Sequence, residues 1–308
     1  MKTCVIGSIN MDLVAVVDRF PQPGETIIGR DFATYPGGKG GNQAVALGRL
    51  GADVLMVGKV GNDSFGEQYL NNLRVNGVSN DGIKIHEGIS TGIAVIEVDT
   101  AGENHIVVIP GANGKVDREF IEEKWNLIIN RDIFLFQLEI PLDAVLYAVK
   151  NLKEAGKLII LDPAPARELP DEIYKCIDYI TPNETEIAVL TGTEIDEDGD
   201  LEKAGRKLVE KGVKHVVIKA GKRGAYLATR DDFIHVPGFG VQSVDTTAAG
   251  DSFNAGLAFA LARGDDILES IRFANAVGAI STTAKGAQSA MPSLMEVESF
   301  INQQTVNE

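Results

Sequence analysis

From about residue 117 onward, short apolar runs alternate with segments of helical periodicity. The apolar runs lie at 133–138, 158–161, 179–181 and 215–219, and the helical patterns lie near 117–128, 142–155 and 199–211. Continuous apolar strands separated by helices are typical of a parallel sheet that is buried on both faces. The alternation therefore predicts a layered α/β/α domain with a mostly parallel central sheet. A hairpin of 226–228 and 233–236 is expected at its edge, and helices fill most of 251–303.

The first third of the chain contains extended segments that do not fit this alternation. After a first strand at 3–9, such segments occur at 13–17 and 25–35, and residues 92–112 resemble a hairpin around a turn at 99–104. Segments left out of the parallel sheet can form a small sheet of their own. We therefore expect one domain over 1–308, with a lid sheet from segments within 12–35 and 92–112. The lid would cover the crevice at the strand ends.

Composition excludes several classes of function. The hydrophobic fraction of 44% is enough for a large core, and the net charge of −15 argues against binding to nucleic acid or to anionic membranes. Cys4 and Cys176 provide no disulfide framework or metal-ligand spacing. No apolar run reaches the roughly 18 residues of a membrane span, and the N-terminus reaches Asp12 too soon for a signal peptide. A cytoplasmic protein is expected.

The run at 244–253 carries the most chemical information. Small residues lead into Asp251, and an apolar helical pattern with Phe253, Leu257 and Leu261 follows. A small-residue turn that opens a helix presents unpaired backbone N–H groups, which suit phosphate oxygens. An aspartate in the first turn can take a proton from a hydroxyl group. The run indicates phosphoryl transfer to an alcohol, although an acidic helix cap after a glycine turn is the simpler alternative.

Two further motifs lie in the first 44 residues. The glycine-rich run at 36–44 permits close backbone approach to a ligand, and it is not a Walker A loop. Asn10 and Asp12 follow the first strand, where a carboxamide and a carboxylate suit a polyol. The glycine-rich run can also be only a tight connection between two elements, and Asn10 and Asp12 can be only turn-forming residues.

Two more motifs lie later in the chain. Asn183 and Glu186 are three residues apart at a helix start, so they can share a face and hold Mg²⁺ near phosphates, or form a capping box. The run at 219–224 follows a strand and either covers a nucleotide or forms a basic turn.

Taken in order, these motifs resemble the PfkB family of carbohydrate kinases over essentially the whole chain. The matching elements are Asn10-x-Asp12, the glycine-rich run at 37–42, Asn183-x-x-Glu186, Gly221-x-x-Gly224 and the run at 245–251. The runs at 163–170 and 285–288 are typical of the branch that phosphorylates ribose at its 5-hydroxyl group. The resemblance implies a kinase that uses ATP, Mg²⁺ and a monovalent cation, usually K⁺, and that pairs as a homodimer through the lid.

The resemblance also implies a role for individual residues. Asp251 would be the general base, and the backbone amides of Ala248, Ala249 and Gly250 would form the anion hole. The sugar would be held by Asn10, Asp12, Gly38, Lys39, Asn42 and Glu139. ATP would lie against Asn183, Lys219, Gly221, Gly224, Gly250 and Asn275, with Mg²⁺ near Glu186. The K⁺ ligands would be Asp245, Thr247, Ser281, Ala284 and Gly286.

Two positions depart from the family pattern. Lys219 stands where such kinases often carry threonine, so its ammonium group either strengthens phosphate contact or projects outward. Ala290 stands where a polar cation ligand can occur, so water would take one coordination position.

Three other functions remain as alternatives. A related kinase could act on 2-deoxyribose, another sugar or a nucleoside, because such enzymes share the anion hole and the aspartate. A non-catalytic sugar-binding protein could use the same fold. A dinucleotide-dependent dehydrogenase is disfavoured, because the first strand is followed by Gly7-Ser8-Ile9-Asn10 and not by G-x-G-x-x-G.

Overall fold

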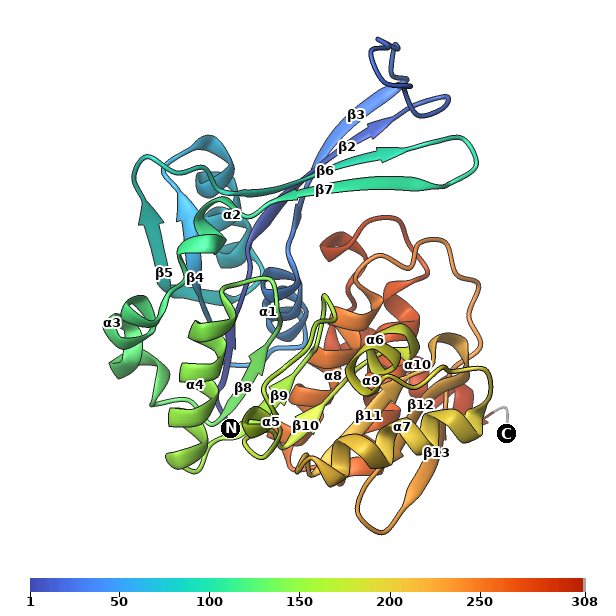
Figure 1. The fold of residues 1–308 in the computed structure, drawn as a ribbon. Coiled ribbons are helices and arrows are strands. Elements are labelled where there is room, and N and C mark those ends of the chain that lie inside the picture. The colour runs from blue at the N-terminus through green and yellow to red at the C-terminus, as the bar shows by residue number, and fades with distance from the viewer. Residues whose placement is uncertain (307–308) are drawn as a thin grey trace.

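The computed structural model describes residues 1–306, and a nine-stranded sheet forms its central layer (Figure 1). The strand order is β13-β12-β11-β10-β9-β8-β1-β4-β5. The strands from β11 to β5 are parallel, and β12 and β13 form the antiparallel edge hairpin that the sequence predicts. The bounds are β1 (Thr3–Ile6), β4 (Val54–Gly61), β5 (Val78–His86), β8 (Ile133–Phe136), β9 (Leu158–Leu161), β10 (Tyr179–Ile180), β11 (His215–Lys219), β12 (Gly224–Ala228) and β13 (Phe233–Pro237).

Helices cover both faces of this sheet, because its central strands are apolar on both sides. In β1, Cys4 and Ile6 pack into the core on one face while Val5 packs into the core on the other. The first face is covered by α3 (Arg118–Ile128), α4 (Leu142–Glu154), α5 (Asp171–Tyr174), α6 (Glu184–Thr191) and α7 (Asp198–Glu210). The second is covered by α1 (Lys39–Arg49), α2 (Ser64–Val75), α8 (Ala249–Arg263) and α9 (Ile267–Ser281), with α10 (Leu294–Val306) packed outside α9. The predicted layered α/β/α fold is confirmed.

Three short 3₁₀ turns complete the description of the helices. They are η1 (Gly111–Lys115), η2 (Gly221–Arg223) and η3 (Gln288–Ala290). Within residues 1–306, no helix has the length and apolar character needed to cross a membrane.

A second sheet of four strands projects from one end of the central sheet (Figure 1). Its order is β3 (Asp31–Gly37), β2 (Asn10–Val16), β6 (Gly92–Val98) and β7 (Asn104–Ile109). The separate small sheet and the 92–112 hairpin are thus confirmed. The first strand is shorter than predicted, since β1 ends at Ile6 and Asn10 already begins β2. Most of the extended segment expected at 25–35 is irregular, with β3 starting only at Asp31.

The sequence analysis assigned no element to 51–91, where the structure has β4, α2 and β5. In β4 the apolar run is interrupted by Gly58, Lys59 and Gly61, so its hydrophobic pattern is weak. Lys59 is nevertheless buried, because its ammonium group donates to the carbonyl of Lys115 and lies 3.5 Å from Asp117. Helix α1 begins at Lys39, inside the glycine-rich run at 36–44.

Candidate active site

Polar side chains gather where five parallel strands of the central sheet end. Ser8 follows β1, Glu139 follows β8, Asp162 follows β9 and Asn183 follows β10, while Lys219 is the last residue of β11. The carboxyl ends of parallel strands meet at one edge of the sheet, where α/β proteins bind ligands. These side chains lie near the first turns of α1 and α8, which come from the second helix layer.

Asp251 is the third residue of α8 and lies in the first turn of this helix, where the sequence predicts it. Ala248 precedes this helix in the left-handed conformation, with φ of 59°. The amide of Ala249 bonds to the carbonyl of Thr246 at 3.2 Å, and the first helical hydrogen bond runs from Ser252 to Ala248 at 2.9 Å. The amides of Gly250 and Asp251 therefore stand at the open end of α8, where an anion is stabilised by the helix dipole.

The Asp251 carboxylate is 6% exposed and is held by two amide side chains from α1. Asn42 Nδ2 donates to its Oδ2 at 3.0 Å, and Gln43 Nε2 donates to its Oδ1 at 3.1 Å. Burial raises the pKa of Asp251 to about 6, and the nearby Asp162 acts in the same direction, whereas Lys39 and the two amide donors lower it. Asp251 is therefore ionised at neutral pH, and it is more basic than an ordinary aspartate.

The residues predicted to hold a sugar lie on the side of Asp251 next to the second sheet. Asn10 and Asp12 are in β2, and Glu139 Oε2 accepts hydrogen bonds from Ser8 Oγ at 2.5 Å and from the amide of Lys39 at 3.1 Å. Asn10 and Glu139 line a cavity of about 330 Å³. The structure thus brings these predicted polar groups to one place.

Two glycines of the glycine-rich run permit this arrangement. A Cβ atom on Gly37 would lie 2.2 Å from Asp12 Oδ2, and one on Gly38 would lie 2.7 Å from the amide nitrogen of Asn10. Gly38 also has φ of 81°, which side-chain-bearing residues rarely adopt. Burial, with the charges of Glu139 and Asp251, raises the pKa of the enclosed Asp12 to about 7.

Lys39 places an ammonium group among the carboxylates of this site. Burial alone would lower its pKa, but the charges of Asp251, Asp162 and Glu139 outweigh that effect and hold the pKa above its ordinary value. Lys39 is therefore a fixed positive charge at the head of α1.

A cavity of about 540 Å³ lies on the other side of the α8 N-terminus. Its wall includes five of the six residues predicted to contact ATP, namely Lys219, Gly221, Gly224, Gly250 and Asn275, together with the aromatic ring of Phe239. Asn275 fixes part of this wall, because its Nδ2 donates to the carbonyls of Val236 and Pro237 at 3.1 Å each. The sixth residue, Asn183, forms a parallel bridge with Lys219 and lies beside the cavity.

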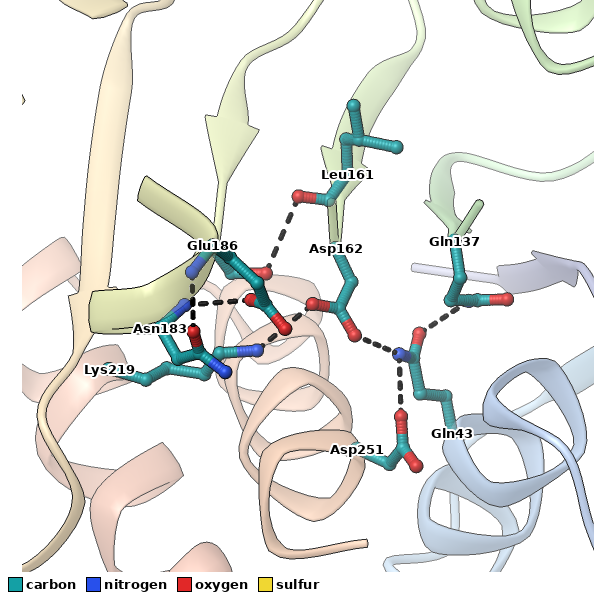
Figure 2. A network of polar contacts seen from close by, with 9 residues as sticks. Gln43, Gln137, Leu161, Asp162, Asn183, Glu186, Lys219 and Asp251 are labelled. Atoms are coloured by element: carbon teal, nitrogen blue, oxygen red, sulfur yellow. Dashed lines mark hydrogen bonds and ion pairs between the residues drawn. The ribbon is translucent and has the colours of Figure 1, made fainter. Parts of the chain in front are cut away.

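The capping box that the sequence leaves open is formed. Asn183 Oδ1 accepts from the amide of Glu186 at 2.7 Å, and Glu186 Oε2 accepts from the amide of Asn183 at 2.8 Å. Burial raises the pKa of Glu186, Lys219 opposes this shift, and Asp162 reinforces it. Glu186 therefore caps α6 and also belongs to the charge cluster at the strand ends. Figure 2 shows it beside Lys219 and Asp162.

The two loops that carry the predicted K⁺ ligands are joined. Asp245 Oδ2 accepts from the amide of Gly286 at 2.9 Å, and its Oδ1 accepts from the amide and hydroxyl of Thr247 at 2.9 and 2.6 Å. The amide of Asp245 bonds to the carbonyl of Thr282 at 3.1 Å, next to Ser281. Ala284 lies exposed between these loop contacts. The loops bring oxygen-rich segments together directly behind the start of α8.

Four residues of the site were not identified from the sequence. Gln43 Nε2 donates to Asp162 Oδ2 at 3.0 Å as well as to Asp251, and thus bridges two carboxylates (Figure 2). Asn113 Nδ2 donates to Asn10 Oδ1 at 2.7 Å, and Gln288 Nε2 donates to Asn42 Oδ1 at 2.9 Å. For Asp162 a signal was present, since it directly follows the apolar run at 158–161.

Comparison with known proteins shows similarity over the whole chain. A family model described as the pfkB family of carbohydrate kinases matches residues 1–294. The chain is 42% identical over 299 residues to a ribokinase of Bacillus subtilis, with 97% of this chain and 99% of the relative covered. It is 36% identical over 303 residues to a deoxyribokinase of Salmonella typhi, with 98% and 99% covered. A structure of Arabidopsis thaliana ribokinase complexed with ribose and ATP matches with a TM-score of 0.92 at 34% identity, over 97% of each chain.

Proposed function

This chain belongs to the pfkB family of carbohydrate kinases, and we propose that it is a ribokinase that transfers the γ-phosphoryl group of ATP to the 5-hydroxyl group of D-ribose. The observation that carries the proposal is the position of Asp251. It is buried at the open end of α8, between the polar sugar-side cluster and the nucleotide-sized cavity. A base at that point can reach a hydroxyl group on one side while the backbone amides face a phosphoryl group on the other.

The reaction follows from these positions. Asp251 accepts the proton of the 5-hydroxyl group, while the sugar oxygen forms a bond to the γ-phosphorus. The bond from this phosphorus to the β-phosphate oxygen breaks, and its electron pair stays on the ADP that leaves. Asn42 and Gln43 hold both carboxylate oxygens, so the base is oriented before the sugar binds.

The sugar-side cluster accounts for the acceptor. Asn10, Asp12 and Glu139 are buried or partly buried hydrogen-bonding groups, and a site of this kind favours an acceptor with many hydroxyl groups. Gly38, Lys39 and Asn42 complete the proposed sugar site. The similarity to a deoxyribokinase keeps 2-deoxyribose as the second candidate acceptor, to be separated from ribose by experiment.

The residues present also fit the two proposed cations. A divalent Mg²⁺ is coordinated by few carboxylates together with water and phosphate oxygens, and it would lie near Glu186 at the strand ends. Bound there, it would neutralise phosphate charge. K⁺ would bind between the joined loops through Asp245 and carbonyls of Thr247, Ser281, Ala284 and Gly286. Its charge would steady the loop that leads into α8.

We further propose that the four-stranded sheet acts as a lid and joins two subunits. Strand β7 presents adjacent apolar side chains to solvent, with Ile106, Val107 and Val108 exposed by 53, 62 and 50%. Successive residues of a strand face opposite sides, so Ile106 and Val108 share one face of the small sheet and Val107 lies on the other. Exposed apolar side chains on an edge strand are typical of an interface between protein chains. A cytoplasmic location would suit an enzyme that consumes ATP.

The test is ADP release from ATP with ribose and with 2-deoxyribose, each in K⁺ and in Na⁺. Ribose-dependent turnover that K⁺ raises is expected. Higher turnover on 2-deoxyribose would move the assignment to the second candidate, and folded protein without turnover on either sugar would contradict a pentose kinase.

The role of Asp251 is tested separately with Asp251→Asn. This variant keeps the shape of the side chain and should fold, while turnover falls by about 10²–10⁴-fold, the range for loss of a general base. Asp178→Asn, which changes a mostly buried aspartate at the opposite end of the sheet, should remain active. An unchanged rate for Asp251→Asn would remove Asp251 as the base.

A further inference from the structure

Lys219 occupies the boundary between the nucleotide cavity and the open end of α8. It lines the same cavity as Gly221 and Asn275, and its side chain is 13% exposed. A Cβ atom placed on Gly250 would lie 3.4 Å from Lys219 Nζ. The ammonium group therefore lies beside the backbone that is proposed to receive the phosphoryl group. Of the two orientations left open by the sequence, the structure shows the inward one.

A buried carboxylate holds this ammonium group in place. Lys219 Nζ lies 2.9 Å from Asp162 Oδ1, and Asp162 is 3% exposed. The other oxygen of Asp162 accepts from Gln43 Nε2 at 3.0 Å, and the same nitrogen donates to Asp251. Figure 2 shows one continuous chain of contacts from Lys219 to the base.

We propose that Lys219 is a catalytic residue that stabilises the phosphoryl group during transfer, and that Asp162 positions it for that role. The inference rests on the proposed kinase function. As the bond to the β-phosphate breaks, negative charge shifts to the ADP oxygen, and an ammonium group beside Gly250 lies close to that charge. The ammonium group of Lys39 lies near Asp251, Asp162 and Glu139, so it is a second cation at the reacting centre.

The competing explanation is that Lys219 merely neutralises Asp162. Two variants separate these roles. Lys219→Met removes the ammonium group, and the double variant Lys219→Met with Asp162→Asn also removes the buried charge that would be left unpaired. Lys214→Met is the matched control, because Lys214 pairs with the mostly buried Asp178 at 2.7 Å just before the start of β11.

Catalysis by Lys219 predicts a loss of turnover that does not depend on Asp162. We expect about 10²-fold lower kcat in both the single and the double variant, the effect typical of removing one preorganised charge donor. The KM for ribose should not change, and Lys214→Met should behave like the unmodified protein. Recovery of kcat in the double variant would overturn the proposal. If the single variant does not fold, the kcat of the double variant is compared with that of the unmodified protein instead.

A binding measurement provides a readout that does not require turnover. The affinity for ADP is measured by calorimetry with ribose and Mg²⁺, in the presence and absence of aluminium fluoride, which mimics a phosphoryl group in transfer. We expect the fluoride-dependent gain in affinity to be lost in Lys219→Met and kept in Lys214→Met, while ADP alone binds equally well. A full gain in Lys219→Met would overturn the inference. If the unmodified protein shows neither the fluoride-dependent gain nor ADP release, the result would instead contradict the kinase function.

Discussion

Replacing Asp162 by asparagine should lower the pKa of the proposed base, Asp251, although Asp251 itself is unchanged. Asp162 and Asp251 accept hydrogen bonds from the same nitrogen of Gln43, at 3.0 and 3.1 Å. The charge of Asp162 is one of the causes that raise the pKa of Asp251 to about 6. Asp162→Asn removes this charge and should lower the pKa of Asp251.

The size of the shift can be estimated from these contacts. Because both oxygens bond to one nitrogen, they lie no more than about 6 Å apart. At an effective dielectric constant of about 20, two unit charges at that separation repel by roughly 3 kcal/mol, or about two pKa units. Burial is the larger cause of the raised pKa and remains in the variant. Among the causes of the shift, Asp162 is smaller than burial and smaller than the opposing charge of Lys39, so we expect a downward shift of about one unit.

The assay is the pH dependence of kcat/KM for ATP at saturating ribose. Asp251 must be ionised to accept a proton, so activity falls as the pH drops through its pKa. The acidic limb should lie near pH 6 in the unmodified protein and about one unit lower in Asp162→Asn. The ionisation of ATP itself is common to all variants, and Asp178→Asn serves as the control for removing a buried aspartate. An acidic limb at the same pH in Asp162→Asn and the unmodified protein would refute the electrostatic coupling.

Two other variants test parts of the site at a distance from the base. Asn113→Ala removes the hydrogen bond to the Asn10 side chain and the one from the backbone amide of Ile9. The KM for ribose should therefore rise about tenfold at constant KM for ATP, equivalent to roughly 1.4 kcal/mol. An unchanged KM for ribose would contradict this role. Val107→Lys places a charge among the exposed apolar side chains of β7 and should shift a dimer toward monomer in sedimentation measurements, whereas Glu103→Lys at the nearby turn should not. Dimers of equal stability in both variants would exclude β7 from the interface.

Much of the fold could be predicted because buried parallel strands have a strong local pattern. The runs that became β8 and β9 are apolar at every position, since side chains on both faces are covered by helices. Strand β5 was missed because its sequence is largely polar, and its place at the sheet edge follows only from pairing with β4. Such pairing depends on residues distant in the sequence and leaves no local signal.

The candidate site was predictable only to the level of which segments contribute to it. The glycine-rich run located Asn42, but the neighbouring Gln43 contacts Asp162 and Asp251, which are 119 and 208 residues away in the chain. At Asn183 and Glu186 the sequence allowed either a cap or a ligand site. The cap uses Oε2 of Glu186, so the same carboxylate can close the helix and still contribute charge to the site. A local motif therefore cannot show whether a side chain caps a helix or contributes to a site, because one side chain can do both.

The charge balance of the site explains why cations are needed for the proposed reaction. The strand ends and the start of α8 concentrate five carboxyl groups, those of Asp12, Glu139, Asp162, Glu186 and Asp251, around the ammonium groups of Lys39 and Lys219. Asp251 already has a raised pKa in this environment, and a triphosphate would add further negative charge beside it. Without compensation its pKa would rise further, and the base would become protonated near neutral pH. A divalent cation at the strand ends and the ammonium group of Lys219 both oppose that shift, so charge neutralisation at the phosphate also preserves the base on the sugar side.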